Sequence, residues 1–211
     1  MDCPSADWTG ILLAGGQSKR MGRDKRHMSV SGLHDKSLLD HASQLLEQLC
    51  LERVVLVGDA QEANLPSGFR VVADRQSGSG PLAAISDSLR DIHTPFALVI
   101  PVDMPCLRAP QMHELMLRFV RKSNSPAALF VLDTDQRPTF PLLAKREFGA
   151  SLAAEVAAGQ VRLFQGLRAA GAAEVKPQWQ HSDSSGPDPF LNLNRPTDVA
   201  ILESGQTPKR P

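Results

Sequence analysis

The sequence predicts an α/β fold, in which a mostly parallel sheet carries helices on both faces. Apolar runs typical of buried strands alternate along the chain with segments of helical spacing. The strand candidates are apolar throughout, which indicates a sheet that is covered on both sides. With 211 residues and no internal repeat, the chain suits one domain with a sizeable core.

The first 122 residues predict strands and helices in the order expected of such a sheet. A long loop follows the first strand, and Ser37 is expected to cap the first helix. The second helix has a proline at its first position, where proline is favoured. Strands are expected at 8–14, 53–58, 69–74 and 96–103, and helices at 37–50, 81–92 and 109–122.

The remaining residues complete the same domain. Two strand candidates occupy 126–133 and 137–144, helical stretches lie around 145–170, and a further strand is expected at 172–176. After a polar segment, order returns at 190–194 and in a short helix from Pro196. We expect the domain to span residues 1–203 and residues 204–211 to form a flexible tail.

Composition excludes several classes of protein. The chain has 23 basic and 23 acidic residues, so its formal net charge is zero, whereas a nucleic-acid binder is usually basic. Three cysteines are too few for a disulfide framework, so we expect a reducing, cytoplasmic compartment and a buried thiol at Cys106. No apolar stretch is long enough to span a membrane, and the N-terminus lacks a signal-peptide pattern.

The loop after the first strand carries the clearest signal for an anion. The stretch ILLAGGQSKRMGRDK, residues 11–25, joins an apolar run to two glycines and a cluster of basic residues. The loop is about twice as long as the usual ~2–6 residues, and it leaves the carboxyl end of a strand, where ligands bind in such sheets. Amides of Gly15 and Gly16 with a nearby lysine could cradle phosphates. A solvated basic turn is the alternative, and spacing alone leaves both open.

Two aspartates follow strand candidates. Asp103 ends the apolar run in VIPVDMPCL, where an acid is either a turn cap or a ligand of Mg²⁺, which takes one or two carboxylates plus substrate phosphates. Asp74 ends the third strand candidate and precedes GSGPLA. That segment fits the dinucleotide fingerprint, but it does not follow the first strand and Pro81 removes an amide, so we reject a NAD site.

Two asparagines two positions apart precede the last helix candidate. In FLNLNRPTDV, residues 190–199, Asn192 and Asn194 are expected on the same face of a strand. Their amides can donate and accept, which suits a polar pterin or a phosphate. The alternative is that they cap the following helix, which is more credible for Asn194.

Together these segments resemble the molybdenum cofactor guanylyltransferases. The similar motifs are L-A-G-G-x-S-x-R-M-G-x-D-K from Leu13 to Lys25, the G-P-L-A segment, P-x-D-x-P-x-L around Asp103 and the N-x-N segment. GQVRLFQGLR, residues 159–168, also aligns with a segment of the family. The matches extend from residue 11 to residue 199, and they imply a single-domain, Rossmann-like nucleotidyltransferase fold.

The resemblance also implies which residues form the site. It assigns catalysis to Lys25, Asp103 and Arg20, and Mg²⁺ binding to Asp103. The implied nucleotide-binding residues are Leu13, Ala14, Gly15, Gly16, Lys25, Asp74, Gly80 and Asp103, and the implied pterin-binding residues are Asn192, Asn194 and Arg162. Gly58 departs from the family, whose members often have asparagine there.

The activity implied by the resemblance is transfer of GMP from GTP to the terminal phosphate of molybdopterin or molybdenum-molybdopterin. The product is molybdopterin guanine dinucleotide, pyrophosphate is released, and proteins of molybdoenzyme assembly are expected partners. Two alternatives stay open: a related nucleotidyltransferase that uses CTP or a sugar-phosphate acceptor, and a non-catalytic nucleotide-binding regulator. Neither a nucleic acid nor a membrane is expected as a partner.

Overall fold

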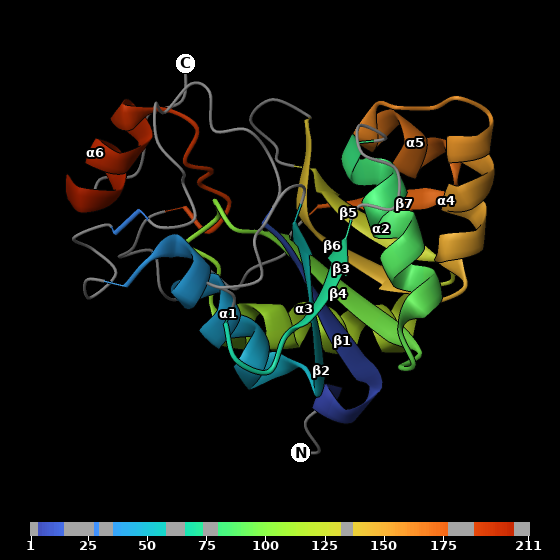
Figure 1. Cartoon of the computed structure of the whole chain (residues 1–211), viewed down its shortest axis with the longest axis horizontal. Coiled ribbons are helices and arrows are strands. Elements are labelled where there is room, and N and C mark those ends of the chain that lie inside the picture. The colour runs from blue at the N-terminus through green and yellow to red at the C-terminus, as the bar shows by residue number, and fades with distance from the viewer. Residues whose placement is uncertain are drawn as a thin grey trace.

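A computed structural model describes residues 4–14, 28–29, 36–57, 66–73, 80–131, 137–176 and 188–204 (Figure 1). The strands are β1 (Trp8–Leu13), β2 (Glu52–Val57), β3 (Arg70–Ala73), β4 (Phe96–Pro101), β5 (Ala127–Val131), β6 (Pro138–Lys145) and β7 (Ala172–Val175). The helices are the 3₁₀ helix η1 (Pro4–Asp7), α1 (Leu38–Leu49), α2 (Gly80–Asp91), α3 (Ala109–Lys122), α4 (Phe148–Ala157), α5 (Leu163–Ala169) and α6 (Pro196–Ser204).

The strands in the described part of the chain form one sheet with the order β3-β2-β1-β4-β6-β5-β7. Strands β1 to β4 are parallel, and β6 is antiparallel to both of its neighbours. Strand β7 pairs parallel with β5. The expected mostly parallel sheet is therefore confirmed. The one reversed strand, β6, is joined to β5 by six residues, a short connection of the kind that antiparallel neighbours permit.

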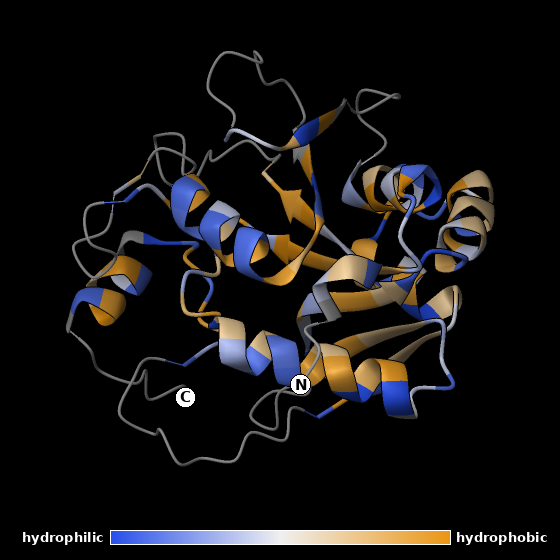
Figure 2. Ribbon diagram, turned by 90° about the horizontal axis from the view of Figure 1, so that it is seen from below, coloured by the Kyte–Doolittle hydropathy of each residue, from blue (hydrophilic) through white to orange (hydrophobic). Residues whose placement is uncertain are grey.

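Helices cover both faces of this sheet. Helices α1 and α3 pack against each other on one face, and α2, α4 and α5 form a layer on the other (Figure 1). Figure 2 shows hydrophobic strands between helices whose hydrophilic residues turn outward. Helix α6 lies apart from the α2, α4 and α5 layer, at the opposite side of the molecule in both views.

The core lies between the sheet and these helices. Trp8, at the start of β1, is fully buried and stacks on Phe96 with a centroid separation of 5.2 Å. Phe119 of α3 meets both rings edge-on. The aromatic cluster ties β1, β4 and α3 together at the amino end of the sheet, since burial and edge contacts of aromatic rings are both favourable.

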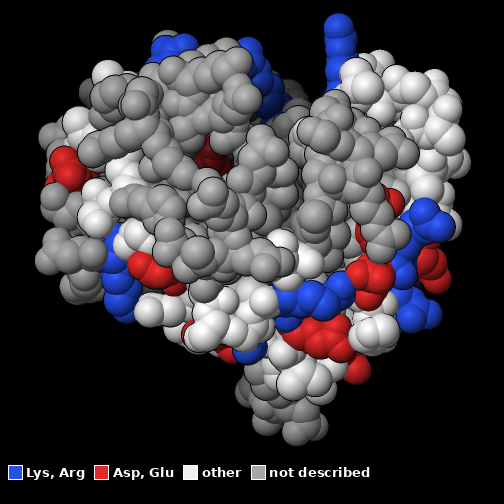
Figure 3. Space-filling view, viewed as in Figure 1, with Lys and Arg blue, Asp and Glu red and all other residues white. Residues whose placement is uncertain are grey.

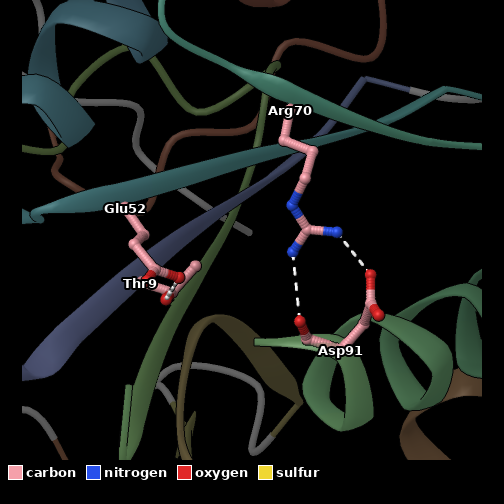
Figure 4. Close-up of polar contacts among 4 residues, drawn as sticks. All are labelled: Thr9, Glu52, Arg70 and Asp91. Carbon is pink, nitrogen blue, oxygen red and sulfur yellow. Dashed lines mark hydrogen bonds and ion pairs between the residues drawn. The ribbon is translucent and has the colours of Figure 1, made fainter. Parts of the chain in front are cut away.

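Three polar side chains at the amino ends of the strands, those of Thr9, Thr94 and Arg70, find partners within the protein. The buried hydroxyls of Thr9 and Thr94 are 2.6 Å apart, and Thr9 also donates to Glu52 over 3.3 Å. Arg70 pairs with the Asp91 carboxylate at the end of α2, and it also donates to the Asp91 carbonyl (Figure 4). These contacts link neighbouring elements at the edge opposite the predicted site.

Most predicted elements are confirmed, with small shifts of their ends. Helix α3 has the predicted bounds, and the Ser37 hydroxyl accepts a hydrogen bond from the Asp40 amide as the predicted cap. Strand β4 ends at Pro101, so Val102 and Asp103 lie in a turn and not in the strand. Residues 205–211, most of the expected tail, lie outside the described residues.

Candidate functional site

Three segments that are distant in sequence meet at the carboxyl end of the sheet. The Val102 amide, just after β4, donates to the Leu13 carbonyl at the end of β1 over 3.1 Å. The Asp103 carbonyl accepts from the Leu193 amide over 2.9 Å. The ends of β1 and β4 and the segment before α6 are thereby held side by side, and each carries residues that the sequence predicts for the site.

Buried neighbours hold the turn that carries Asp103. Val102, Met104 and Cys106 are buried, while Asp103 is partly exposed. One carboxylate oxygen of Asp103, Oδ1, is shielded from solvent. Buried residues on both sides of Asp103 therefore fix its backbone, and its carboxylate is exposed only in part.

Helix α1 carries His41, whose imidazole is half-buried near the Pro105 backbone, two residues after Asp103. Burial lowers the pKa of His41; the Pro105 hydrogen bond opposes that shift and the positive charge of Lys36 adds to it. His41 is therefore mainly neutral at neutral pH, as a side chain that packs inside the protein should be.

Cys106 is the buried thiol that the sequence predicts. Burial raises its pKa to about 11; the negative charge of Asp188 acts in the same direction, and Arg108 opposes it. A thiol with so high a pKa carries very little thiolate at neutral pH, so it is no candidate for a nucleophile.

The segment before α6 presents Asn192 to the site. Leu191 and Leu193 are buried, Asn192 is half-buried and Asn194 is exposed. The Asn192 Oδ1 atom is buried and has no hydrogen-bond partner in the described part of the protein. A buried amide oxygen without a donor is costly, which is the state expected of a group that awaits a ligand.

The expected strand at 190–194 is absent from the described structure. The backbone there is irregular, and the Asn194 amide donates to the Asn192 carbonyl over 3.1 Å. The Asp198 carboxylate accepts from the amides of Asn194 and Arg195 at 2.7 Å each, so an acid in the first turn of α6 caps the helix. The alternative that the asparagine side chains also cap this helix stays a prediction.

Gly80 lies at the other side of the site, as the first residue of α2. Its φ of +77° lies in a region that L side chains rarely adopt, which favours glycine at that position. A Cβ there would lie 3.9 Å from the Val161 carbonyl, so the loop before α5 runs beside the start of α2.

Arg162 follows in that loop and is exposed. Its amide is held by the Gln160 side chain over 3.0 Å. Arg162 thus follows the residue that approaches Gly80, while Asn192 lies in the segment that leads into α6. The grouping of Arg162, Asn192 and Asn194 as pterin-binding residues stays a prediction.

Several predicted residues lie outside the described residues. They are Gly15, Gly16, Arg20, Lys25 and Asp74, together with Gly58. Of the first segment, Leu13 ends β1 half-buried, and Ala14 is buried directly after it. The described chain resumes at Met28, whose carbonyl accepts from the Leu38 amide over 3.1 Å. The site assignments for the first five of these residues stay predictions, as does the effect of Gly58.

Sequence reasoning missed His41 and the capping function of Asp198. An acid at the third position after a helix start is a known capping signal, and it could have identified Asp198. A histidine within an amphipathic helix gives no such signal, because its neighbour, Pro105, is distant in sequence.

The described regions give little sign of a charged patch or of a group of metal ligands. On the face drawn in Figure 3, basic and acidic side chains are interspersed among the coloured residues. Within the described ranges no group of three or more His, Cys, Asp and Glu side chains could hold a metal ion. None of the helices described is long and apolar enough to cross a membrane.

Comparison with known proteins identifies the family. Residues 10–175 match the MobA-like NTP transferase domain. A probable molybdenum cofactor guanylyltransferase of Chloroflexus aggregans is 35% identical over 202 residues, which cover 93% of each chain.

Two solved structures share the fold. Molybdopterin-guanine dinucleotide biosynthesis protein A of Archaeoglobus fulgidus superposes with a TM-score of 0.74 at 19% identity, over 93% of this chain and 97% of that one. The 2-C-methyl-D-erythritol 4-phosphate cytidylyltransferase of Thermus thermophilus gives 0.65 at 16% identity, over 92% and 96%. The chain belongs to the MobA-like NTP transferase family.

Proposed function

We propose that this protein is a molybdenum cofactor guanylyltransferase that transfers GMP from GTP to the terminal phosphate of molybdopterin or molybdenum-molybdopterin. The observation that carries the proposal is the junction of Leu13, Asp103 and Leu193. It joins the start of the glycine-rich loop, the acid after β4 and the asparagine segment at one edge of the sheet. That edge is where open α/β sheets bind ligands.

The nucleotide would lie between the first loop and the start of α2. Amides of Gly15 and Gly16, with Arg20 and Lys25, would hold the triphosphate, and Asp74 would contact the nucleoside. Gly80 permits a close backbone approach at the start of α2. Because Arg162 lies in the loop beside Gly80, we place it on the nucleotide side of the site and not with the pterin.

The residues present fit a Mg²⁺ ion. Asp103 offers hard carboxylate oxygen in a partly exposed turn, and Mg²⁺ commonly takes one or two carboxylates together with phosphate oxygens. Asp103 would hold the ion. When bound, Mg²⁺ would supply neutralisation of negative charge at the triphosphate.

The acceptor would lie on the α6 side. The buried Oδ1 of Asn192 can accept from a ligand amino group, and a pterin carries such donors. Leu193 fixes the distance between this asparagine and Asp103, because its amide binds the Asp103 carbonyl directly. Asn194 is exposed, so its contribution to the acceptor should be smaller.

The chemistry needs no general base. A phosphate monoester has a second pKa of about 6, so the acceptor phosphate is largely ionised at neutral pH. One of its oxygens would form a bond to the α-phosphorus of GTP, and the bond from that phosphorus to the bridging oxygen of the β-phosphate would break. The electron pair leaves with pyrophosphate. Lys25 would offset the charge that develops on the leaving group, so catalysis is positioning and charge neutralisation.

Lys25 provides a direct test. We expect Lys25→Ala to slow GMP transfer by about a hundredfold or more, as expected for loss of a preorganised charge at the leaving group. The measurement is single-turnover formation of the guanine dinucleotide. Lys36→Ala is the control, because Lys36 also precedes α1 but points its ammonium to Gln44, 2.7 Å away. A Lys25→Ala protein with unchanged turnover would remove this residue from the site.

One alternative activity has a specific observation in its favour. The likeness to a cytidylyltransferase shows that this fold also occurs in a protein named for CTP chemistry. Binding of GTP, CTP and ATP, each with Mg²⁺, separates the two, because only preferential GTP binding agrees with the proposal. GTP binding without pyrophosphate release would instead favour a non-catalytic regulator.

We also propose a cytoplasmic site of action and product transfer to molybdoenzyme-assembly proteins.

A further inference from the structure

Helix α2, which begins at Gly80, is approached closely by a glycine from each of two neighbouring helices. Helices α4 and α5 pack against α2 and against each other. A Cβ on Gly166 of α5 would lie 2.3 Å from Leu82 Cδ2, two residues after Gly80. A Cβ on Gly149 of α4 would lie 2.9 Å from Leu89 Cβ, near the other end of α2. Real Cβ atoms essentially never come so close, so the two glycines allow α4 and α5 to approach α2 as they do.

Gly166 has no room for a side chain, because its neighbours cannot easily move. Leu82 is fully buried, so a shift of its methyl groups would press on a close-packed core. The Gln160 Cγ atom would also lie only 3.0 Å from a Cβ on Gly166. Inside a helix glycine is otherwise unfavourable, and alanine is the better helix former. The close approach of α5 to α2 therefore accounts for glycine at this position.

Gly166 also takes part in the contacts that hold the backbone of Arg162. Its amide donates to the Arg162 carbonyl over 2.9 Å. The Gln160 side chain accepts from the Arg162 amide over 3.0 Å, and this side chain is the one that lies against Gly166. The Val161 carbonyl, one residue before Arg162, would lie 3.9 Å from a Cβ on Gly80. Both backbone polar groups of Arg162 are thus bound where α5 meets the start of α2.

We propose that Gly166 is a positioning residue that fixes the backbone of Arg162 at the start of α2. The inference rests on the proposed function for the roles of Arg162 and Gly80 at the nucleotide, whereas the contacts of Gly166 do not depend on it. Because position 166 carries no side chain, α5 reaches Leu82 and holds the loop of residues 158–162 against α2. An exposed arginine on an anchored backbone has fewer conformations to give up when it binds an anion.

The test compares Gly166→Ala with Gly149→Ala. Both substitutions place a Cβ against α2, but Gly149 faces Leu89 and Arg90, away from the start of that helix. Stability is measured by chemical denaturation. Hydrogen exchange of the amides of residues 162 and 166 reports the anchoring of Arg162 without any substrate, and titration with GTP and Mg²⁺ gives the dissociation constant for the nucleotide.

We expect the two variants to lose stability alike and to differ in binding. Overpacking should lower the folding equilibrium constant by about tenfold in each, which outweighs the gain that alanine brings to a helix. Only in Gly166→Ala should exchange of the two amides accelerate by about tenfold, the effect of losing one hydrogen bond. The dissociation constant for GTP should rise by about the same factor there, and Gly149→Ala should bind GTP as the wild type does.

Gln160→Ala tests the anchoring of Arg162 without overpacking. The substitution removes the acceptor of the Arg162 amide and adds no atom near α2. Because Gln160 is only half-buried and lies outside the helices, this variant should fold even if Gly166→Ala does not. Exchange of the Arg162 amide and the dissociation constant for GTP should both rise, by about threefold to tenfold.

Three results would overturn the inference. A Gly166→Ala protein more stable than the wild type would show that α5 does not approach α2 so closely. Equal weakening of GTP binding in the two glycine variants would show that the packing of α2 as a whole matters, and not the position of Arg162. Wild-type GTP affinity in Gln160→Ala would show that Arg162 needs no fixed backbone. If the wild-type protein does not bind GTP, the proposed function fails, while stability and exchange still decide whether Gly166 holds Arg162.

Discussion

The two ends of the sheet differ in the polar contacts that they carry. At the amino end, Thr9 and Thr94 face each other, and Arg70 pairs with Asp91 (Figure 4 draws Thr9, Arg70 and Asp91), while Trp8 Nε1 and Arg53 Nε are buried without a partner in the described structure. At the carboxyl end, Asn192 keeps a buried oxygen without a partner in the described structure, and Gly80 holds a backbone conformation that other residues rarely adopt. The contacts at the amino end join elements of the fold, whereas Asn192 and Gly80 lie at the proposed site, so substitutions at the two ends should have separable effects.

The largest effect is expected at Asp103. Asp103→Ala should reduce GMP transfer by about a thousandfold, because charge neutralisation at the triphosphate is worth several kcal/mol. The midpoint of thermal unfolding should change little, since the carboxylate is partly exposed. Asp7→Ala removes an exposed acid at the amino end and should leave turnover unchanged. Wild-type turnover in Asp103→Ala would end the assignment of a metal to this residue.

Asn192 should show opposite effects on stability and activity. Asn192→Leu removes a buried unpaired acceptor, so the free energy of unfolding should stay constant or rise by about 1 kcal/mol. Transfer should fall about tenfold or more through KM for the acceptor, as expected for loss of a ligand hydrogen bond. Chemical denaturation and acceptor titration measure the two quantities. A variant that loses stability without losing activity would make Asn192 a structural residue.

Gly80 can be compared with a glycine of similar conformation away from the site. Gly171 has φ +101°, and a Cβ there would meet Pro126 at 3.8 Å, close to the 3.9 Å at Gly80. Alanine at either position should cost about 1–2 kcal/mol of stability through backbone strain. Only Gly80→Ala should also raise KM for GTP, by several-fold. Equal GTP affinities in the two variants would place Gly80 outside the nucleotide site.

Thr9 should affect stability and not substrate binding. Thr9→Val keeps the shape but removes the hydroxyl that faces Thr94, which should lower the free energy of unfolding by about 1 kcal/mol. Both KM values should equal those of the wild type. A changed kcat in this variant would show that the two ends of the sheet are coupled.

The smallest effect concerns pH. Burial raises the pKa of Cys106 from 9.0 to about 11, so the unfolded thiol loses its proton at lower pH than the folded one. The stability that this group contributes is complete below pH 9.0 and is lost as the pH rises through about 11. Cys106→Ala should flatten the pH dependence of unfolding in that window. An unchanged slope would contradict the raised pKa.

Local signals account for most of the fold. The bounds of α3, the Ser37 cap and the position of Asp103 just after β4 all follow from spacing and from cap and turn preferences within a few residues. The orientation of β6 depends instead on which strands it joins. Sequence patterns of short apolar strands do not contain that information.

Sequence patterns predict which types of residue form the site better than they predict how those residues are arranged. Asp103 and Asn192 stand out by pattern, but the hydrogen bond from Leu193 to Asp103 joins segments 90 positions apart. The proximity of His41 to Pro105 and of Gly80 to Val161 is equally non-local. Such contacts are set by how whole elements pack, so one sequence without a structure gives no signal for them.

The central claim is tested most directly by pyrophosphate release from purified protein with GTP, Mg²⁺ and molybdopterin. Parallel reactions contain CTP or ATP in place of GTP, or omit the acceptor. The account predicts stoichiometric release that requires molybdopterin, is fastest with GTP and is lost in Asp103→Ala. Release that is equal with all three nucleotides, or that proceeds without the acceptor, would contradict it.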